Sequence, residues 1–268
     1  RLIEEKRCPI FKRRSFFHPY DDVLDQSVGN ATADLYAYLR DHTDFDTDLI
    51  WNNALRSMHM ADLVKNLQLT YVLPTDVTDC DPSGAKVALV LHVYYLDLLE
   101  QTLGYARSMP EGCDIIVTVG SQEKAEAVRE ACEGLPYRVD VRVIENRGRD
   151  VSALLVGVKD VIADYDYVCF AHDKKVTQLE PYSKGEGFAV KCFENILASR
   201  EFVANVIEQF EKEPRLGLLT PTPPNHAEYF PIYSYGWSQN FVRTSRLLRE
   251  MKLNVPLSPE KDVIAPLG

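Results

Sequence analysis

The sequence has little of several features that mark specialised classes of protein. Its 268 residues include only 13 glycines, which excludes a repetitive fibre and a flexible low-complexity chain. No apolar run reaches about 18 residues, so no membrane-spanning helix is predicted. The net charge is −10, and non-specific wrapping of nucleic acid requires a basic surface. We therefore expect an ordinary globular protein with no nucleic-acid partner.

Cysteine is present but in no metal-binding or redox pattern. The 6 cysteines form no C-x-x-C pair and no spacing typical of a zinc site. Cys113 and Cys169 lie in or beside apolar runs, where a thiol behaves as a small buried hydrophobe. The first residues also lack the apolar core of a signal peptide. A reducing compartment is therefore favoured, and we expect a cytoplasmic protein.

A polar, turn-rich stretch from Thr78 to Gly84 divides the chain. Before it, apolar residues recur at helical intervals in three segments: 32–40, 48–58 and 60–67. Ahead of these helices, residues 9–17 mix basic and aromatic side chains. Two interpretations of this arm stay open: docking on the protein body, or peripheral contact with the inner face of the cell membrane. We expect residues 1–83 to form the arm and a helical accessory region.

Strand and helix patterns alternate over residues 84–268. The predicted strands are 87–94, 114–119, 137–144, 167–171 and 216–220. The predicted helices are 96–107, 122–132, 150–162 and 188–210, the last broken near Ser199. Such alternation predicts an α/β fold, a mostly parallel sheet with helices on both faces. Neither G-x-G-x-x-G nor G-x-x-x-x-G-K-[ST] is present, which disfavours a dinucleotide-binding Rossmann domain and excludes a P-loop.

Two charged clusters follow two neighbouring strand patterns. Asn-Arg-Gly-Arg-Asp at residues 146–150 opens a helix, and His-Asp-Lys-Lys at residues 172–175 ends the next strand. Ligands bind at the carboxyl ends of the strands in an open α/β sheet. The amino end of a helix and basic side chains both suit phosphate. The two clusters therefore predict a site for a phosphorylated ligand.

With His92-Val93-Tyr94-Tyr95 at the end of the first strand and Thr118 at the end of the second, these clusters resemble the rhamnan synthesis F family. The two signatures N-R-G-R-D and H-x-K-K in succession are more specific than either alone. The resemblance covers most of the chain, which stops short of the family's usual C-terminal stretch. It implies a C-terminally truncated domain that acts in bacterial surface polysaccharide synthesis, on rhamnan or O-antigen-type glycans.

The layout is also similar to the nucleotide-binding half of inverting glycosyltransferases with a GT-A fold. In those enzymes the corresponding strand ends in Asp-x-Asp, which holds Mg²⁺ or Mn²⁺. Here His172-Asp173-Lys174 stands in its place, and one carboxylate beside two ammonium groups is a poor cage for a hard cation. We therefore predict no metal site, with a weak divalent site at Asp173 as the alternative. Either the lysines neutralise the leaving diphosphate, or the site has lost catalysis and only binds.

The resemblance assigns the nucleotide-sugar donor to residues at the strand ends: His92, Tyr94, Asn146, Arg149, Asp150, His172, Asp173, Lys174 and Lys175. Structural roles stay open for several of them. Asp150 is also a candidate helix cap, and His172 a strand-end histidine with satisfied hydrogen bonds. Tyr94 is equally a candidate for a buried aromatic, and the two lysines for a solvated loop.

For transfer, a carboxylate must take the proton from the acceptor hydroxyl, and Asp262 precedes an apolar segment where such enzymes often place this base. Trp237 is a candidate platform for the acceptor sugar, or a packing residue. The expected function is transfer of a sugar, with rhamnose from a dTDP donor suggested by the family's name, to a glycan or lipid-linked acceptor. The alternative is a non-catalytic nucleotide- or glycan-binding module of a larger protein.

Overall fold

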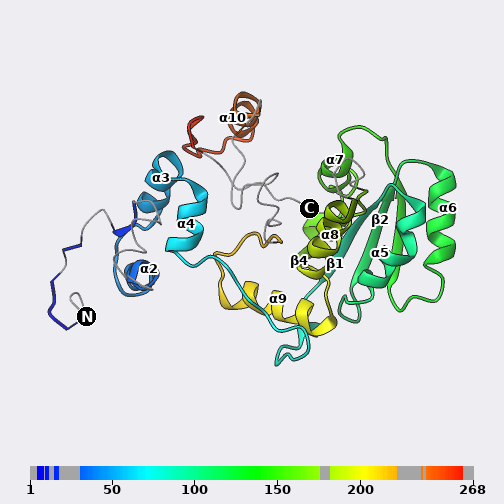
Figure 1. Cartoon of the computed structure of the whole chain (residues 1–268), viewed down its shortest axis with the longest axis horizontal. Coiled ribbons are helices and arrows are strands. Elements are labelled where there is room, and N and C mark those ends of the chain that lie inside the picture. Colours follow the sequence, from blue (N-terminus) through cyan, green and yellow to red (C-terminus); the bar gives the residue numbers. More distant parts are fainter. Residues whose placement is uncertain are drawn as a thin grey trace. The chain divides into compact units, whose positions relative to one another are not determined.

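The computed structural model describes residues 5–8, 10–11, 15–17, 31–175, 182–221, 237 and 240–261 (Figure 1). The chain forms two compact units. The first takes in residues 1–71 and 225–265, and the second takes in residues 72–224 and 266–268. The sequence-based division into residues 1–83 and 84–268 stays a prediction.

The second unit is built on a sheet of four parallel strands (Figure 1). The strands are β1 (Val87–Val93), β2 (Asp114–Val119), β3 (Arg138–Val143) and β4 (Tyr167–His172), in the order β3-β2-β1-β4. Every residue of β1 is buried, as expected for an inner strand covered on both faces. The predicted α/β fold with a parallel sheet and surrounding helices is confirmed, and the architecture is Rossmann-like.

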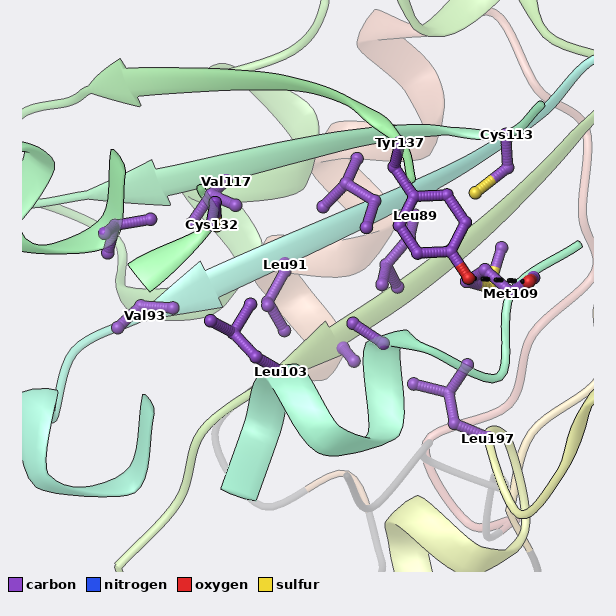
Figure 2. Close-up of a cluster of buried hydrophobic side chains, with 14 of the residues drawn as sticks. Leu89, Leu91, Val93, Leu103, Met109, Cys113, Val117, Cys132, Tyr137 and Leu197 are labelled. Carbon is purple, nitrogen blue, oxygen red and sulfur yellow. Dashed lines mark hydrogen bonds between the residues drawn. The ribbon is translucent and has the colours of Figure 1, made fainter. Parts of the chain in front are cut away.

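One face of the sheet carries the main hydrophobic core (Figure 2). Helices α5 (Leu99–Ala106), α6 (Gln122–Ala131) and α9 (Arg200–Lys212) contribute to this core. Leu91 is fully buried in it. The hydroxyl of Tyr137 donates a hydrogen bond of 2.9 Å to the carbonyl of Met109, which satisfies the polar end of a buried ring.

The opposite face is covered by α7 (Arg149–Leu155) and the residues that follow it. Val90 and Ile116 from the sheet pack with Val158, and partly buried Leu154 and Phe170 complete this smaller cluster. The predicted helix 150–162 is therefore shorter than expected. It ends at Leu155, and a 3-10 turn, η4 (Ile162–Asp164), follows later.

The segment after β4 confirms one prediction and contradicts another. The predicted break near Ser199 is confirmed, because α8 (Tyr182–Glu194) ends before it and the Ser199 hydroxyl caps α9 by accepting from the Phe202 amide at 3.0 Å. The strand predicted at residues 216–220 is wrong. A turn precedes this segment, in which the Leu216 amide donates to the Glu213 carbonyl, and Leu218 is 68% exposed instead of packed on a sheet.

The described part of the first unit is helical, as predicted for its N-terminal portion. It contains α2 (Ala31–His42), α3 (Asp48–Ser57), α4 (Met60–Asn66) and α10 (Phe241–Glu250). Phe16 of the arm is buried with Leu39 and Ile50, and the Thr32 hydroxyl donates to the Ser15 carbonyl at 2.8 Å. For the described residues of the arm, this packing favours docking on the body.

Candidate functional site

The strand order creates a switch point between β1 and β4. From β1 the chain moves outward through β2 to β3, then returns through α7 to place β4 on the other side of β1. The connections that leave β1 and β4 therefore diverge, and ligands of open α/β sheets bind in the crevice at such a point. The predicted site residues of β1 and β4 lie at or just beyond the carboxyl ends of these two strands, beside the switch point.

Asp173 joins the ends of β1 and β4. It is buried, and its carboxylate oxygens accept hydrogen bonds from the amide of Tyr94 at 3.0 and 2.9 Å and from the amide of Tyr95 at 2.5 Å. Its own amide donates to the His92 carbonyl at 3.1 Å. Burial raises the pKa of the Asp173 carboxyl, although the two amides oppose that shift. Asp173 thus fixes the two tyrosines that follow β1.

A lysine ammonium group lies over the ring of each of these two tyrosines. The Nζ of Lys124 lies 4.4 Å from the ring centroid of Tyr94 and also donates to the Tyr94 carbonyl. The Nζ of Lys175 lies 4.9 Å from the ring centroid of Tyr95 and pairs with the Asp97 carboxylate. Tyr94 is 45% exposed, so the interpretation as a buried aromatic is wrong for this residue.

Lys124 and Asp97 were missed by the sequence-based assignment. Lys124 lies in the first turn of α6, where its amide donates to the capping hydroxyl of Ser121. The available signal was its place just after the second strand of the sheet. Because β2 and β1 are hydrogen-bonded neighbours, a side chain there reaches the residues that follow β1.

A row of polar side chains runs across the α7 face of the sheet. His92 of β1 is in register with Thr118 of β2 and with His172 of β4. The His92 Nδ1 lies 3.0 Å from the Thr118 hydroxyl. The Nδ1 of His172 is buried without a hydrogen-bond partner in the described structure, and the Asp150 carboxylate is 3.9 Å from it. Through Asp150, the charged cluster at residues 146–150 therefore lies next to the cluster at residues 172–175.

Burial favours the neutral form of the two histidines in this row. Burial lowers the pKa of His92 and of His172, and Asp150 opposes both shifts by favouring the protonated ring. The interpretation of His172 as a satisfied strand-end histidine is wrong for its Nδ1. A buried polar atom without a partner costs about 1–3 kcal/mol, and such atoms in native proteins call for an explanation. A neutral imidazole here is able to accept a proton.

The Asn-Arg-Gly-Arg-Asp turn has an unusual backbone. Gly148 precedes α7 with φ of +93°, and a Cβ there would lie 2.9 Å from the Ser152 Cβ. Arg149 also has a positive φ, +55°, which is uncommon for a residue with a side chain. Asn146 and Arg149 are exposed. The exposed Arg149 guanidinium is therefore accessible to an anion, which its planar fork suits.

Lys174 points in a different direction from Lys175. Its Nζ lies 4.2 Å from the ring centroid of Phe188 in α8, and it is half-buried. Burial lowers the pKa of Lys174. The interpretation as a solvated lysine loop is therefore wrong for Lys174, and Lys175 is held by Asp97 and Tyr95.

The remaining predicted residues lie in or near the C-terminal segment of the first unit. The Trp237 indole donates to the Ser258 carbonyl at 2.9 Å and its ring packs edge-on against Phe241, 5.2 Å between centroids. These contacts fit a packing residue, and the acceptor role stays a prediction. Asp262 lies outside the described residues.

Neither a cluster of metal ligands nor a membrane-spanning helix occurs among the residues that the structure describes. There, no three His, Cys, Asp or Glu side chains gather as a metal site would require. The weak alternative of Mg²⁺ or Mn²⁺ at Asp173 is untested, but both oxygens of this carboxylate already accept backbone hydrogen bonds. Among the described helices, none combines the length and apolar character needed to cross a bilayer.

A family model described as rhamnan synthesis protein F matches residues 1–268. The chain belongs to the rhamnan synthesis protein F family. The resemblance inferred from the strand-end motifs is thus confirmed, and it covers the whole chain. Comparison with curated proteins and with solved structures finds no match. Membership places this rhamnan synthesis protein F homologue in rhamnan synthesis, a branch of polysaccharide synthesis.

Proposed function

We propose that this rhamnan synthesis protein F homologue is an inverting glycosyltransferase that moves rhamnose from dTDP-rhamnose to a glycan or lipid-linked acceptor. The supporting observation is that Lys124 and Lys175 lie over the two tyrosines that follow β1, while His172 at the end of β4 faces Asp150. The switch point of the sheet lies between these two strands. Sites at this edge suit nucleotides in α/β folds. The sugar itself rests on the family's name.

The donor's two ends would meet different parts of the site. Tyr94 is half-exposed and offers a ring for the thymine base. Positive charge from Arg149, Lys124 and Lys175 would stabilise the diphosphate, where negative charge grows as the bond to the sugar breaks. Lys175 is already held by Asp97, an exposed pair that contributes little to stability. A diphosphate can therefore replace Asp97 as its partner at small cost.

The reaction must also dispose of one proton. The acceptor oxygen forms a bond to the anomeric carbon, the bond from that carbon to the diphosphate breaks, and the hydroxyl proton passes to a base. Asp262 is the base predicted from sequence. Among the described residues, neutral His172 with Asp150 beside it is the second candidate. Comparing Asp262→Asn with His172→Gln identifies the base by which variant loses turnover while dTDP binding persists.

A direct experiment measures dTDP affinity and dTDP-rhamnose turnover for the wild type, Arg149→Ala and Lys175→Ala. Loss of one charge-assisted contact predicts at least about tenfold weaker dTDP binding. Lys159→Ala is the matched control, because Lys159 is exposed. EDTA should leave turnover unchanged if the lysines do the work of a metal. A wild type that neither binds dTDP nor consumes dTDP-rhamnose contradicts the proposal.

A non-catalytic module is the second candidate function. It is favoured by the use of the Asp173 carboxylate to hold Tyr94 and Tyr95, because a catalytic Asp-x-Asp site needs that carboxylate for a cation. Tight dTDP binding without consumption of dTDP-rhamnose, with or without added Mn²⁺, would support the module and exclude the enzyme.

A further inference from the structure

Helix α10 (Phe241–Glu250) differs from the other α-helices described here in how little it buries. None of its residues is buried. Val242 is 74% exposed and Leu247 is 52% exposed, and just beyond the helix Met251 is 58% exposed. Leu247 and Met251 share one side of this segment, and two such apolar side chains in contact with water make that side a candidate for an interaction surface.

The sequence of α10 is amphipathic. Phe241, Thr244, Leu248 and Met251 recur at three- and four-residue intervals, and Leu247 lies beside them on the same side of the helix. Phe241 is partly covered by Trp237, whereas Leu247 and Met251 remain exposed. The apolar side of α10 is therefore only partly used within the described structure.

The charge of this segment is opposite to that of the whole chain. Residues 241–252 contain four basic side chains, Arg243, Arg246, Arg249 and Lys252, against one acidic side chain, Glu250. The whole chain carries a net charge of −10. Arg246 pairs with Glu250 at 2.8 Å in an exposed contact. Such a concentration of cations in an acidic protein points to an anionic partner.

We propose that α10 lies on the surface of an anionic phospholipid membrane. Basic amphipathic helices bind in this way, with the apolar side at the acyl boundary and cations at the headgroups. The long stems of arginine and lysine let the charges reach those headgroups beside the apolar side chains. A lipid surface takes up the exposed side chains of Leu247 and Met251 without a preformed pocket. A lipid surface also requires no matching shape.

This inference goes beyond the proposed function and does not depend on it. It also differs from the membrane contact predicted for residues 9–17, since Phe11, Phe16 and Phe17 of that arm pack within the first unit. An anchored α10 would hold the protein at the surface where a lipid-linked acceptor resides.

The test is sedimentation of the full chain with vesicles of phosphatidylcholine, with and without phosphatidylglycerol. The wild type should bind only the anionic vesicles, and high salt should weaken binding because the attraction is screened. Each basic residue contributes roughly fivefold in affinity. The double substitution Arg243→Glu with Arg249→Glu should therefore weaken binding by at least about 25-fold. Leu247→Gln with Met251→Gln should weaken it about tenfold or more.

Arg107→Glu with Lys159→Glu is the matched control, because it reverses two exposed charges of the second unit. It should bind vesicles as the wild type does. All four substituted positions of the test variants are exposed, so circular dichroism should show unchanged folding. Equal binding by wild type and the Arg243/Arg249 variant, or no binding by the wild type, overturns the proposal. Binding to soluble polyglutamate but not to vesicles also overturns it and identifies an acidic protein surface instead.

Discussion

The two charged clusters that flank the switch point are built in different ways. Residues 172–175 follow a strand of the sheet, and Asp173 is fixed by the backbone of its neighbour β1. Residues 146–150 follow β3 at the far edge of the sheet, and their arginines are exposed on a turn with left-handed backbone. Only Asp150 reaches from this turn to the other cluster.

The cluster at residues 172–175 is built to position its neighbours, whereas the cluster at residues 146–150 is built to recognise a ligand. A carboxylate that holds two amides cannot move without leaving them unpaired, so the tip of β4 is a rigid support for Tyr94 and Tyr95. An exposed arginine has lost little side-chain freedom and can be drawn to an anion when it arrives. We infer that the β4 tip shapes the site and that the turn before α7 completes it around the ligand.

The largest effect is expected from Asp173→Ala. The substitution leaves the partly buried amides of Tyr94 and Tyr95 without their acceptor, which costs about 3 kcal/mol in the free energy of unfolding. Asp97→Ala is the control, because its pair with Lys175 is exposed and its loss should change stability far less than Asp173→Ala does. Urea unfolding measures both. Similar losses for the two variants would show that the β4 tip is no more rigid than the surface.

A smaller effect is expected from Gly148→Ala in the other cluster. The new Cβ would meet the Ser152 Cβ at 2.9 Å, on a backbone with φ of +93°, which predicts a loss of about 2 kcal/mol. Gly84→Ala is the control, since its Cβ would meet nothing within 4 Å and its φ is not positive. If the two variants unfold at the same urea concentration, the left-handed turn before α7 is not a fixed part of the fold.

The pH dependence of stability should report the buried histidine row. Folding lowers the pKa of His92 and His172 through burial, so the unfolded chain binds more protons once the pH falls below the ordinary value of 6.5. Stability contributed by the neutral rings is therefore present above pH 6.5 and is lost as the pH falls. The loss between pH 7.5 and 5.5 should reach about 1 kcal/mol and shrink in His172→Gln. An identical pH dependence of stability in that variant would show that His172 does not contribute to it.

The fold was largely predictable because its signals are local. Each strand of the sheet is a short apolar or alternating run followed by a helical pattern, and Ser199 marks a helix start by its capping hydroxyl. The strand prediction at residues 216–220 was wrong because it also relied on a local signal. Apolar composition suggests a strand, but a strand forms only where a neighbour accepts its hydrogen bonds, and Leu218 is exposed instead.

The site was predictable in outline only. The strand-end rule placed residues 172–175 at the switch point, but sequence does not show which way each side chain turns. Lys174 and Lys175 are adjacent, yet one lies over Phe188 and the other over Tyr95. Lys124 escaped notice because its contact with Tyr94 depends on the order of the strands, which is a long-range property.

The smallest effect concerns Lys124, which links α6 to the tyrosine pair. Its ammonium lies over the Tyr94 ring at an exposed position, where such a contact contributes about 0.5–1 kcal/mol. A double-mutant cycle with Lys124→Met and Tyr94→Leu should give a coupling free energy in that range by urea unfolding. If Lys124 also serves the diphosphate, the loss of dTDP binding in Lys124→Met will be largest at low ionic strength and will shrink as salt is added, because the removed contact is one between charges. The loss in Tyr94→Leu will depend less on salt, because that substitution removes no charge. A coupling near zero would mean that Lys124 is held by the Tyr94 carbonyl alone, and that its ammonium is oriented by the backbone rather than by the ring.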